Sequence, residues 1–140
     1  DNSLQTAQES DLIKEVKVLL VEDNDLNMEI AEFILENEGA IVTKAWNGQQ
    51  AVDIFRESKP GDIDVILMDL MMPELNGIQA TKLIRSMNRA DASTIPIIAM
   101  TANAFKEDME MSREAGMNEH LAKPLDSQKI ITTIAKYIKK

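Results

Sequence analysis

Short apolar segments alternate with amphipathic segments along the chain. Five runs rich in β-branched and other apolar residues have the length of buried strands. These runs are Val16 to Val21, Ile41 to Ala45, Ile63 to Met68, Ile95 to Met100 and, more weakly, Glu119 to Ala122. Because each run is short and is flanked by charged or turn-forming residues, we predict five strands.

Each predicted strand is followed by a segment whose apolar residues have helical spacing. The first of these segments carries Leu26, Ile30, Phe33 and Ile34 and ends at Gly39. The other predicted helices start near Asn47, Asn76, Phe105 and Asp126. Crossovers of helix length join parallel strands, so the pattern predicts an α/β fold with a doubly wound parallel sheet covered by helices on both faces.

Polar residues follow four of the predicted strands. Glu22 and Asp23 follow the first strand, Asp69 the third, Thr101 the fourth and Lys123 the fifth. In open parallel sheets, ligands bind beyond the carboxyl ends of the strands, where the strand order reverses. We therefore predict that these residues, far apart in the sequence, meet in one site.

The residue types in this predicted site favour phosphoryl transfer. Three carboxylates in one crevice repel one another, and a proton or a cation relieves the repulsion. A sparse all-oxygen ligand set favours Mg²⁺ over Ca²⁺, because Mg²⁺ keeps several waters and binds phosphate oxygens. Lys123 and Thr101 would offer a positive charge and a hydroxyl donor to a phosphoryl group, and Asp69 could attack it as the nucleophile.

Four segments of the sequence resemble motifs of the response-regulator receiver domains of two-component systems. They are Val18 to Asn24, Val65 to Gly77, Pro96 to Ala102 and Leu121 to Pro124. The resemblance covers the chain from about Val16 to Lys140. It implies a flavodoxin-like (βα)5 sandwich whose five-stranded parallel sheet has the order 2-1-3-4-5. Residues 15–140 would form the receiver domain, and the polar residues 1–14 are expected to be a tail or linker.

The resemblance also implies roles for the acidic residues. Asp69 would accept the phosphoryl group. Asp23, Asp69 and the backbone carbonyl of Met71 would bind Mg²⁺, and Glu22 would assist through a metal-bound water. The Lys123–Pro124 peptide bond is expected to be cis.

Further residues are implied to contact the phosphoryl group or to relay its arrival. Thr101, Ala102, Lys123 and Met71 would bind the phosphoryl oxygens. The position three residues before the lysine often holds Tyr or Phe in this family, and here it is His120. Thr101 and His120 are therefore the implied switch residues. The histidine would affect how phosphorylation is relayed and would leave the chemistry at Asp69 unchanged.

Composition narrows the choice of partners. The chain has 15 Lys and Arg against 24 Asp and Glu, a net charge of −9, which disfavours direct binding to nucleic acid. It has no cysteine and no apolar run near the ~20 residues that cross a bilayer. We expect no membrane contact by this domain and a cytoplasmic location, either free or as the cytoplasmic part of a membrane-anchored kinase.

The sequence around the fourth predicted strand, Ile97 to Phe105, and the polar first residues resemble those of receiver domains at the C-terminus of hybrid histidine kinases. The expected partners are a histidine kinase, a histidine phosphotransfer protein, or both. The domain would catalyse its own aspartyl phosphorylation and dephosphorylation, and in a hybrid kinase the full-length protein would be a kinase.

Taken singly, the same residues could fill other roles, and it is their combination that favours the site. Glu22 and Asp23 could simply cap the first helix, and Asp69 could be a turn former before a loop with Pro and Gly. A metal-dependent phosphatase that uses an aspartyl phosphate would want a second Asp at the position of Met71. A static scaffold would be expected to have lost an acidic residue, the nucleophile or Lys123, and none of these is lost here.

Overall fold

Strands and helices alternate along the chain in the computed structural model, which describes residues 12–102 and 106–138 and, of residues 106–108, the backbone alone. The elements are β1 (Lys17–Val21), α2 (Asp25–Asn37), β2 (Ile41–Ala45), α3 (Gly48–Glu57), β3 (Val65–Asp69), α4 (Gly77–Arg85), β4 (Ile97–Thr101), α5 (Lys106–Ala115), β5 (Glu119–Ala122) and α6 (Ser127–Tyr137). The predicted alternation is confirmed. The predicted helix start at Phe105 lies outside the described residues.

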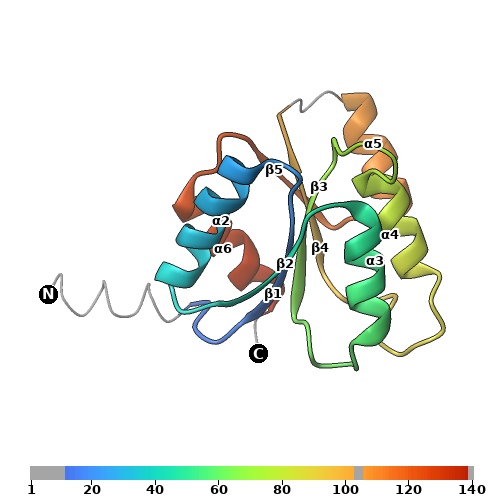
Figure 1. Cartoon of the computed structure of the whole chain (residues 1–140), viewed down its shortest axis with the longest axis horizontal. Coiled ribbons are helices and arrows are strands. Elements are labelled where there is room, and N and C mark those ends of the chain that lie inside the picture. Colours follow the sequence, from blue (N-terminus) through green and yellow to red (C-terminus); the bar gives the residue numbers. More distant parts are fainter. Residues whose placement is uncertain (1–11, 103–105, 139–140) are drawn as a thin grey trace, which may run out of the picture.

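All the strand pairs of the sheet are parallel, and the strand order is β2-β1-β3-β4-β5. Helices α2 and α6 cover one face, and α3, α4 and α5 cover the other (Figure 1). The doubly wound α/β fold and its order 2-1-3-4-5 are therefore confirmed. The order reverses between β1 and β3, which places the expected ligand crevice beyond the ends of these two strands.

Apolar side chains fill both interfaces between the sheet and the helices. Leu19 and Ile66 belong to the apolar cluster on the α3 and α4 side, whereas Leu20 and Leu67 belong to the cluster on the α2 and α6 side. This alternation is expected of strands that are covered on both faces. The central strand β3 is buried along its whole length, and its last residue is Asp69.

Strands β3 and β4 begin and end later than the apolar runs predicted. β3 starts at Val65 instead of Ile63, and β4 starts at Ile97, directly after Pro96, which has no N–H to donate. Each strand also includes the polar residue that was expected to follow it, so Asp69 and Thr101 are held by the sheet itself.

Most of the apolar residues that predicted helix α2 do not face the sheet. Leu26, Ile30 and Phe33 are 63, 43 and 69% exposed. The buried residues of α2 are Met28, Ala31 and Leu35. These have helical spacing too, so the spacing predicts the helix correctly but does not decide which apolar side faces the core. We call the exposed residues Leu26, Ile30 and Phe33 the α2 strip.

The packed domain begins earlier than expected. Ile13 was placed in a tail of residues 1–14, but it is fully buried in the cluster on the α2 and α6 side. The backbone N–H of Glu15 donates to the carbonyl of Gly39 at 2.7 Å, which ties this segment to the turn before β2. Ile13 is therefore part of the packed domain rather than of a tail.

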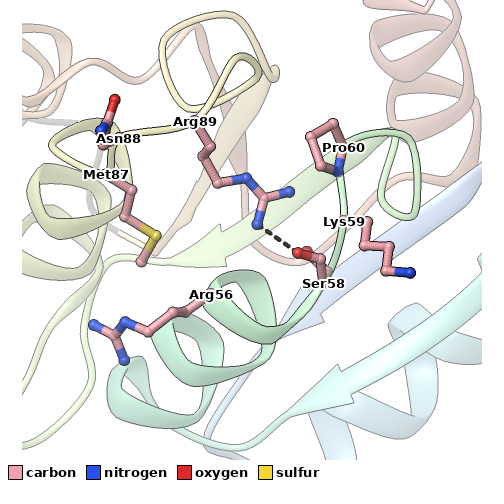
Figure 2. Close-up of a pocket in the computed structure, with 7 residues that line it drawn as sticks. All are labelled: Arg56, Ser58, Lys59, Pro60, Met87, Asn88 and Arg89. Carbon is pink, nitrogen blue, oxygen red and sulfur yellow. Dashed lines mark hydrogen bonds between the residues drawn. The ribbon is translucent and has the colours of Figure 1, made fainter.

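The edge of the sheet where the strands begin, the amino edge, is closed partly by Arg89. Its Nη1 donates to the carbonyl oxygens of Phe55 (2.6 Å) and Ser58 (2.7 Å), and its guanidinium lies 4.1 Å from the centre of the Phe55 ring. An open cavity of about 450 Å³ lies beside it, with Arg56 and Lys59 pointing away from one another (Figure 2). None of the predicted site residues lines this cavity.

Candidate functional site

The predicted site residues lie at the opposite edge, where the strands end. Asp69 is the last residue of β3, and Glu22 and Asp23 directly follow the neighbouring strand β1. Thr101 is the last residue of β4, and the backbone N–H of Lys123 donates to its carbonyl at 2.9 Å. The fold thus brings all five residues to one edge of the sheet.

The three carboxylates form one cluster. Glu22, Asp23 and Asp69 each offer an oxygen, and these oxygens lie within 4.8 Å of one another. Glu22 and Asp69 are 1 and 2% exposed, whereas Asp23 is exposed. The cluster therefore has a buried floor and an open side, and its oxygens could hold a metal ion.

Lys123 reaches into the same cluster. Its Nζ lies 2.9 Å from Glu22 Oε1 and 3.3 Å from Asp69 Oδ2. Burial alone would lower the pKa of Lys123, but its hydrogen bond to Glu22 and the charges of Asp69 and Glu22 raise this pKa above its ordinary value. The ammonium is thus charged at neutral pH and offsets part of the negative charge of the carboxylates.

The environment of Asp69 shifts the pKa of its carboxyl group strongly. Burial and the charge of Glu22 raise the pKa of Asp69 from 3.8 to about 7, against the opposing effect of Lys123. The backbone N–H of Met71 also donates to Asp69 Oδ1 at 3.1 Å, which favours the ionised form. Without a cation, Asp69 is therefore only partly ionised near neutral pH, and a bound cation would favour its ionised form.

Three further predicted site residues lie at the same edge of the sheet, with Thr101 at the end of β4, Ala102 directly after it and Met71 bonded to Asp69. Thr101 is 3% exposed, whereas Ala102 is exposed and Met71 is 67% exposed. The Lys123–Pro124 peptide bond is cis, as the resemblance implied. The metal, phosphoryl and switch roles of these residues stay predictions.

One contact of a predicted switch residue was not foreseen. His120 Nε2 forms a hydrogen bond with the hydroxyl of Ser112, a fully buried residue of α5. Ser112 Oγ also donates to the carbonyl of Met109 at 2.9 Å. Burial and the charge of Arg113 lower the pKa of His120, which keeps its ring neutral at pH 7. Ser112 carries no sequence signal, because a serine in a helix is usually solvated or bonded to its own turn.

Residues 18–135 match the model of the response regulator receiver domain family. This chain belongs to that family. The match spans every strand and helix described above, except the first residue of β1 and the end of α6. The chain is therefore a receiver domain of two-component phosphorelay signalling.

Relatives of this receiver domain include both free-standing regulators and parts of kinases. It is 37% identical over 121 residues to the polar-differentiation response regulator DivK of Brucella anthropi, covering 86% of this chain and 94% of DivK. It is 41% identical over 128 residues, 87% of this chain, to hybrid signal transduction histidine kinase I of Dictyostelium discoideum. The match covers only 7% of that kinase.

Solved structures of other receivers have the same fold. The receiver domain of sensor histidine kinase PA1611 from Pseudomonas aeruginosa PAO1 is 38% identical with a TM-score of 0.80, covering 89% of this chain and 98% of that one. That structure has a magnesium ion coordinated in its active site cleft. The Ssk1 receiver domain of Saccharomyces cerevisiae, in complex with the histidine phosphotransfer protein Ypd1, is 31% identical with a TM-score of 0.77, covering 89% of this chain and 90% of that one.

The helices of this receiver domain are too short or too polar to span a bilayer. This holds for every helix in residues 12–102 and 106–138.

Proposed function

We propose that this receiver domain accepts a phosphoryl group from a phosphohistidine onto Asp69 in a reaction that requires Mg²⁺. The observation that carries the proposal is the cluster at the end of β3. There the carboxylates of Glu22, Asp23 and Asp69 and the ammonium of Lys123 surround one open-sided site. This arrangement provides a nucleophile, oxygen ligands for a cation and a positive charge for the phosphoryl oxygens.

The donor set fits Mg²⁺. Asp23, Asp69 and the carbonyl of Met71 would hold the ion directly, and Glu22 would hold it through a water. When bound, Mg²⁺ would favour ionised Asp69 and neutralise the phosphoryl oxygens. The all-oxygen ligands and the exposed side at Asp23 support this assignment, because Mg²⁺ keeps several of its waters.

The residues of the chain then have distinct tasks in the transfer. A carboxylate oxygen of Asp69 forms a bond to phosphorus while the bond from phosphorus to the donor histidine nitrogen breaks. The released imidazole nitrogen keeps the electron pair and can take a proton. Lys123, already 3.3 Å from Asp69 Oδ2, would pair with a phosphoryl oxygen, and Thr101 and Ala102 would donate hydrogen bonds to the others.

The relay of the signal would involve Thr101 and His120. β5 pairs with β4 along its length, and the contact of His120 with Ser112 joins β5 to α5. A movement of Thr101 toward the phosphoryl group could therefore change the position of α5. If the contact transmits the change, Ser112→Ala will reduce the amide shifts that phosphorylation causes in α5. Unchanged shifts would exclude the contact from the relay.

The partner that brings the phosphohistidine would bind along α2. The helix begins at Asp25, after the acidic pair and the capping residue Asn24, so its first turn lies close to the site. The α2 strip then continues along one side of the helix from Leu26 to Phe33, which is 69% exposed. Such a strip suits packing against a helix of a histidine phosphotransfer protein or of a kinase. The complex of the similar Ssk1 receiver with Ypd1 supports this class of partner.

The chain could act inside a larger protein or alone. Its likeness to part of a hybrid kinase supports a hybrid context, in which the full-length protein would be a kinase. Its likeness to DivK supports a separate regulator. A cytoplasmic location stays a prediction in both cases.

The proposal is tested by intact mass after incubation with acetyl phosphate, with and without Mg²⁺. We expect one added phosphoryl group on the wild type only with Mg²⁺, and none on Asp69→Ala. Asp53→Ala, which removes an exposed carboxylate of α3, is the control and should label like the wild type. Equal labelling of Asp69→Ala, or labelling of the wild type in EDTA, would contradict the proposal.

A further inference from the structure

Helices α3 and α4 begin in the same way, with a capping asparagine and a buried glycine. The side chain of Asn47 accepts from the backbone N–H of Gln50 in front of Gly48, and Asn76 forms a capping box in front of Gly77. Neither glycine has a positive φ, so the backbone conformation does not require glycine at these positions. The reason for glycine must lie in what surrounds it.

Both glycines lie close to the backbone that runs from the last residue of β3 to the start of α4. A Cβ at Gly77 would lie 2.4 Å from the carbonyl oxygen of Asp69. A Cβ at Gly48 would lie 2.2 Å from the carbonyl oxygen of Leu75 and 3.0 Å from its carbonyl carbon. These neighbours are backbone atoms, which cannot rotate away as the end of a side chain can. A side chain at either position would have to displace the chain itself.

The backbone held in this way is the loop of residues 70–76. At its start, the N–H of Gly77 donates to the carbonyl of Leu70 at 3.2 Å. Near its other end, Leu75 rests against Gly48 and packs partly into the core. Between the two contacts lies Met71, whose N–H binds Asp69 Oδ1 at 3.1 Å. The position of Met71 therefore depends on where both ends of the loop are held.

We propose that Gly48 is a positioning residue for the 70–76 loop and, through that loop, for the metal-binding and phosphoryl-binding backbone at Met71. The inference rests on the proposed function, in which the carbonyl of Met71 is a ligand. A Cβ would push Leu75 by roughly 1 Å, and displacements of this size at a site can cost about 100-fold in rate. Gly48 lies on a different helix from the loop and was not among the predicted site residues.

Gly48→Ala tests the inference by Mg²⁺ titration, followed by the backbone amide signals of the protein. We expect Mg²⁺ to bind roughly 10-fold more weakly than in the wild type, as when groups that orient metal ligands are changed. In the Mg²⁺-free protein, the amides of residues 70–76 other than Pro73 should already shift, while those of β5 should not. A change in stability alone would not move the loop signals in this way.

Phe55→Leu is the matched control. Phe55 is buried on the same helix α3, but it lies under Arg89 at the amino edge. The variant should lose stability and keep the Mg²⁺ affinity of the wild type. Wild-type affinity in Gly48→Ala, or an equal loss of affinity in Phe55→Leu, would overturn the inference while the wild type still binds Mg²⁺ and is labelled on Asp69. A wild type that neither binds Mg²⁺ nor is labelled would overturn the proposed function first, and this inference with it.

A measurement on the wild type covers the case in which Gly48→Ala does not fold. Adding Mg²⁺ should shift the amide signal of Gly48, although Gly48 is not a proposed ligand, because the loop rests against it. The amide of Gly61, which has nothing within 4 Å of its Cβ position, should not shift. An unchanged Gly48 signal together with shifted loop signals would overturn the inference.

Discussion

The burial of ionised Asp69 lowers the stability of the metal-free folded protein. Its carboxyl group is 2% exposed and lies beside the equally buried Glu22, with one ammonium between them. The pKa of Asp69 is about 7 in the folded protein, against an ordinary value of 3.8 that applies to the unfolded chain. Between these values the folded state binds more protons, so this group makes stability fall as the pH rises from 3.8 to about 7. The loss is complete about one pH unit above the folded value.

We therefore predict that Asp69→Asn stabilises the metal-free protein. At pH 8 in EDTA, the free energy of unfolding should rise by about 2 kcal/mol, because the variant removes a buried charge but keeps its shape. At pH 4 most of this gain should disappear, because folded Asp69 is then protonated. Urea denaturation at both pH values measures the effect. A variant less stable than the wild type at pH 8 would show that Lys123 more than offsets the repulsion.

Asp53→Asn is the control for these stability measurements at two pH values. Asp53 is an exposed carboxylate that pairs with Arg56 at 3.0 Å. Exposed pairs contribute at most about 1 kcal/mol, so its replacement should change stability little at either pH.

At the scale of elements, Arg85 joins the end of α4 to the segments before β4 and β5. Its Nε and Nη2 donate to the carbonyl of Gly116 at 3.0 and 2.7 Å, and Nη1 donates to that of Ala92 at 3.0 Å. Its Nη2 also donates to Asn118 Oδ1, which accepts the N–H of Ile97 as well. One half-buried side chain thus satisfies two backbone carbonyls and one side-chain oxygen at the amino edge.

Arg85→Met should destabilise the domain by about 3 kcal/mol, because the acceptors left behind lose charged donors. Urea unfolding should show a lower midpoint with an unchanged slope. Arg56→Met is the matched control, since Arg56 is 58% exposed and pairs only at the surface, and it should cost no more than about 0.5 kcal/mol. Equal costs for the two variants would contradict the role of Arg85.

The elements show what the sequence could and could not predict. The order of strands and helices could be predicted from the spacing of apolar residues. The site could be predicted because parallel strands end at one edge of the sheet, which brings the polar residues at their ends together. The buried side of α2 could not be predicted, because Leu26 and Met28 each start a row of apolar residues at helical spacing. The contacts of Gly48 with Leu75 and of Ser112 with His120 depend on how neighbouring elements pack, which no local pattern records.

At the scale of the whole molecule, a partner that binds the α2 strip, as proposed, would also lie beside the acidic cluster, because α2 begins at Asp25. Phe33→Ser should slow phosphoryl transfer from a phosphorylated histidine phosphotransfer protein by roughly 10-fold, the effect of losing one exposed apolar contact of about 1.4 kcal/mol. Labelling by acetyl phosphate should not change, because that donor needs no docking surface. Rapid-quench measurement of both reactions separates docking from chemistry.

Leu83→Ser is the control for this surface. Leu83 is 42% exposed, but it lies on α4, which covers the other face of the sheet (Figure 1). It should leave both reactions unchanged. If both replacements slow the transfer equally, the partner does not bind along α2.

The ends of the described chain both lie at the amino edge. The turn that contains Ile13 is bonded to Gly39, just before β2, and the hydroxyl of Tyr137, at the end of α6, donates to the carbonyl of Asn118, just before β5. A neighbouring domain joined through either end would be attached on the side away from Asp69. Units of this kind can therefore be linked in series while the reactive aspartate of each remains open to a visiting histidine.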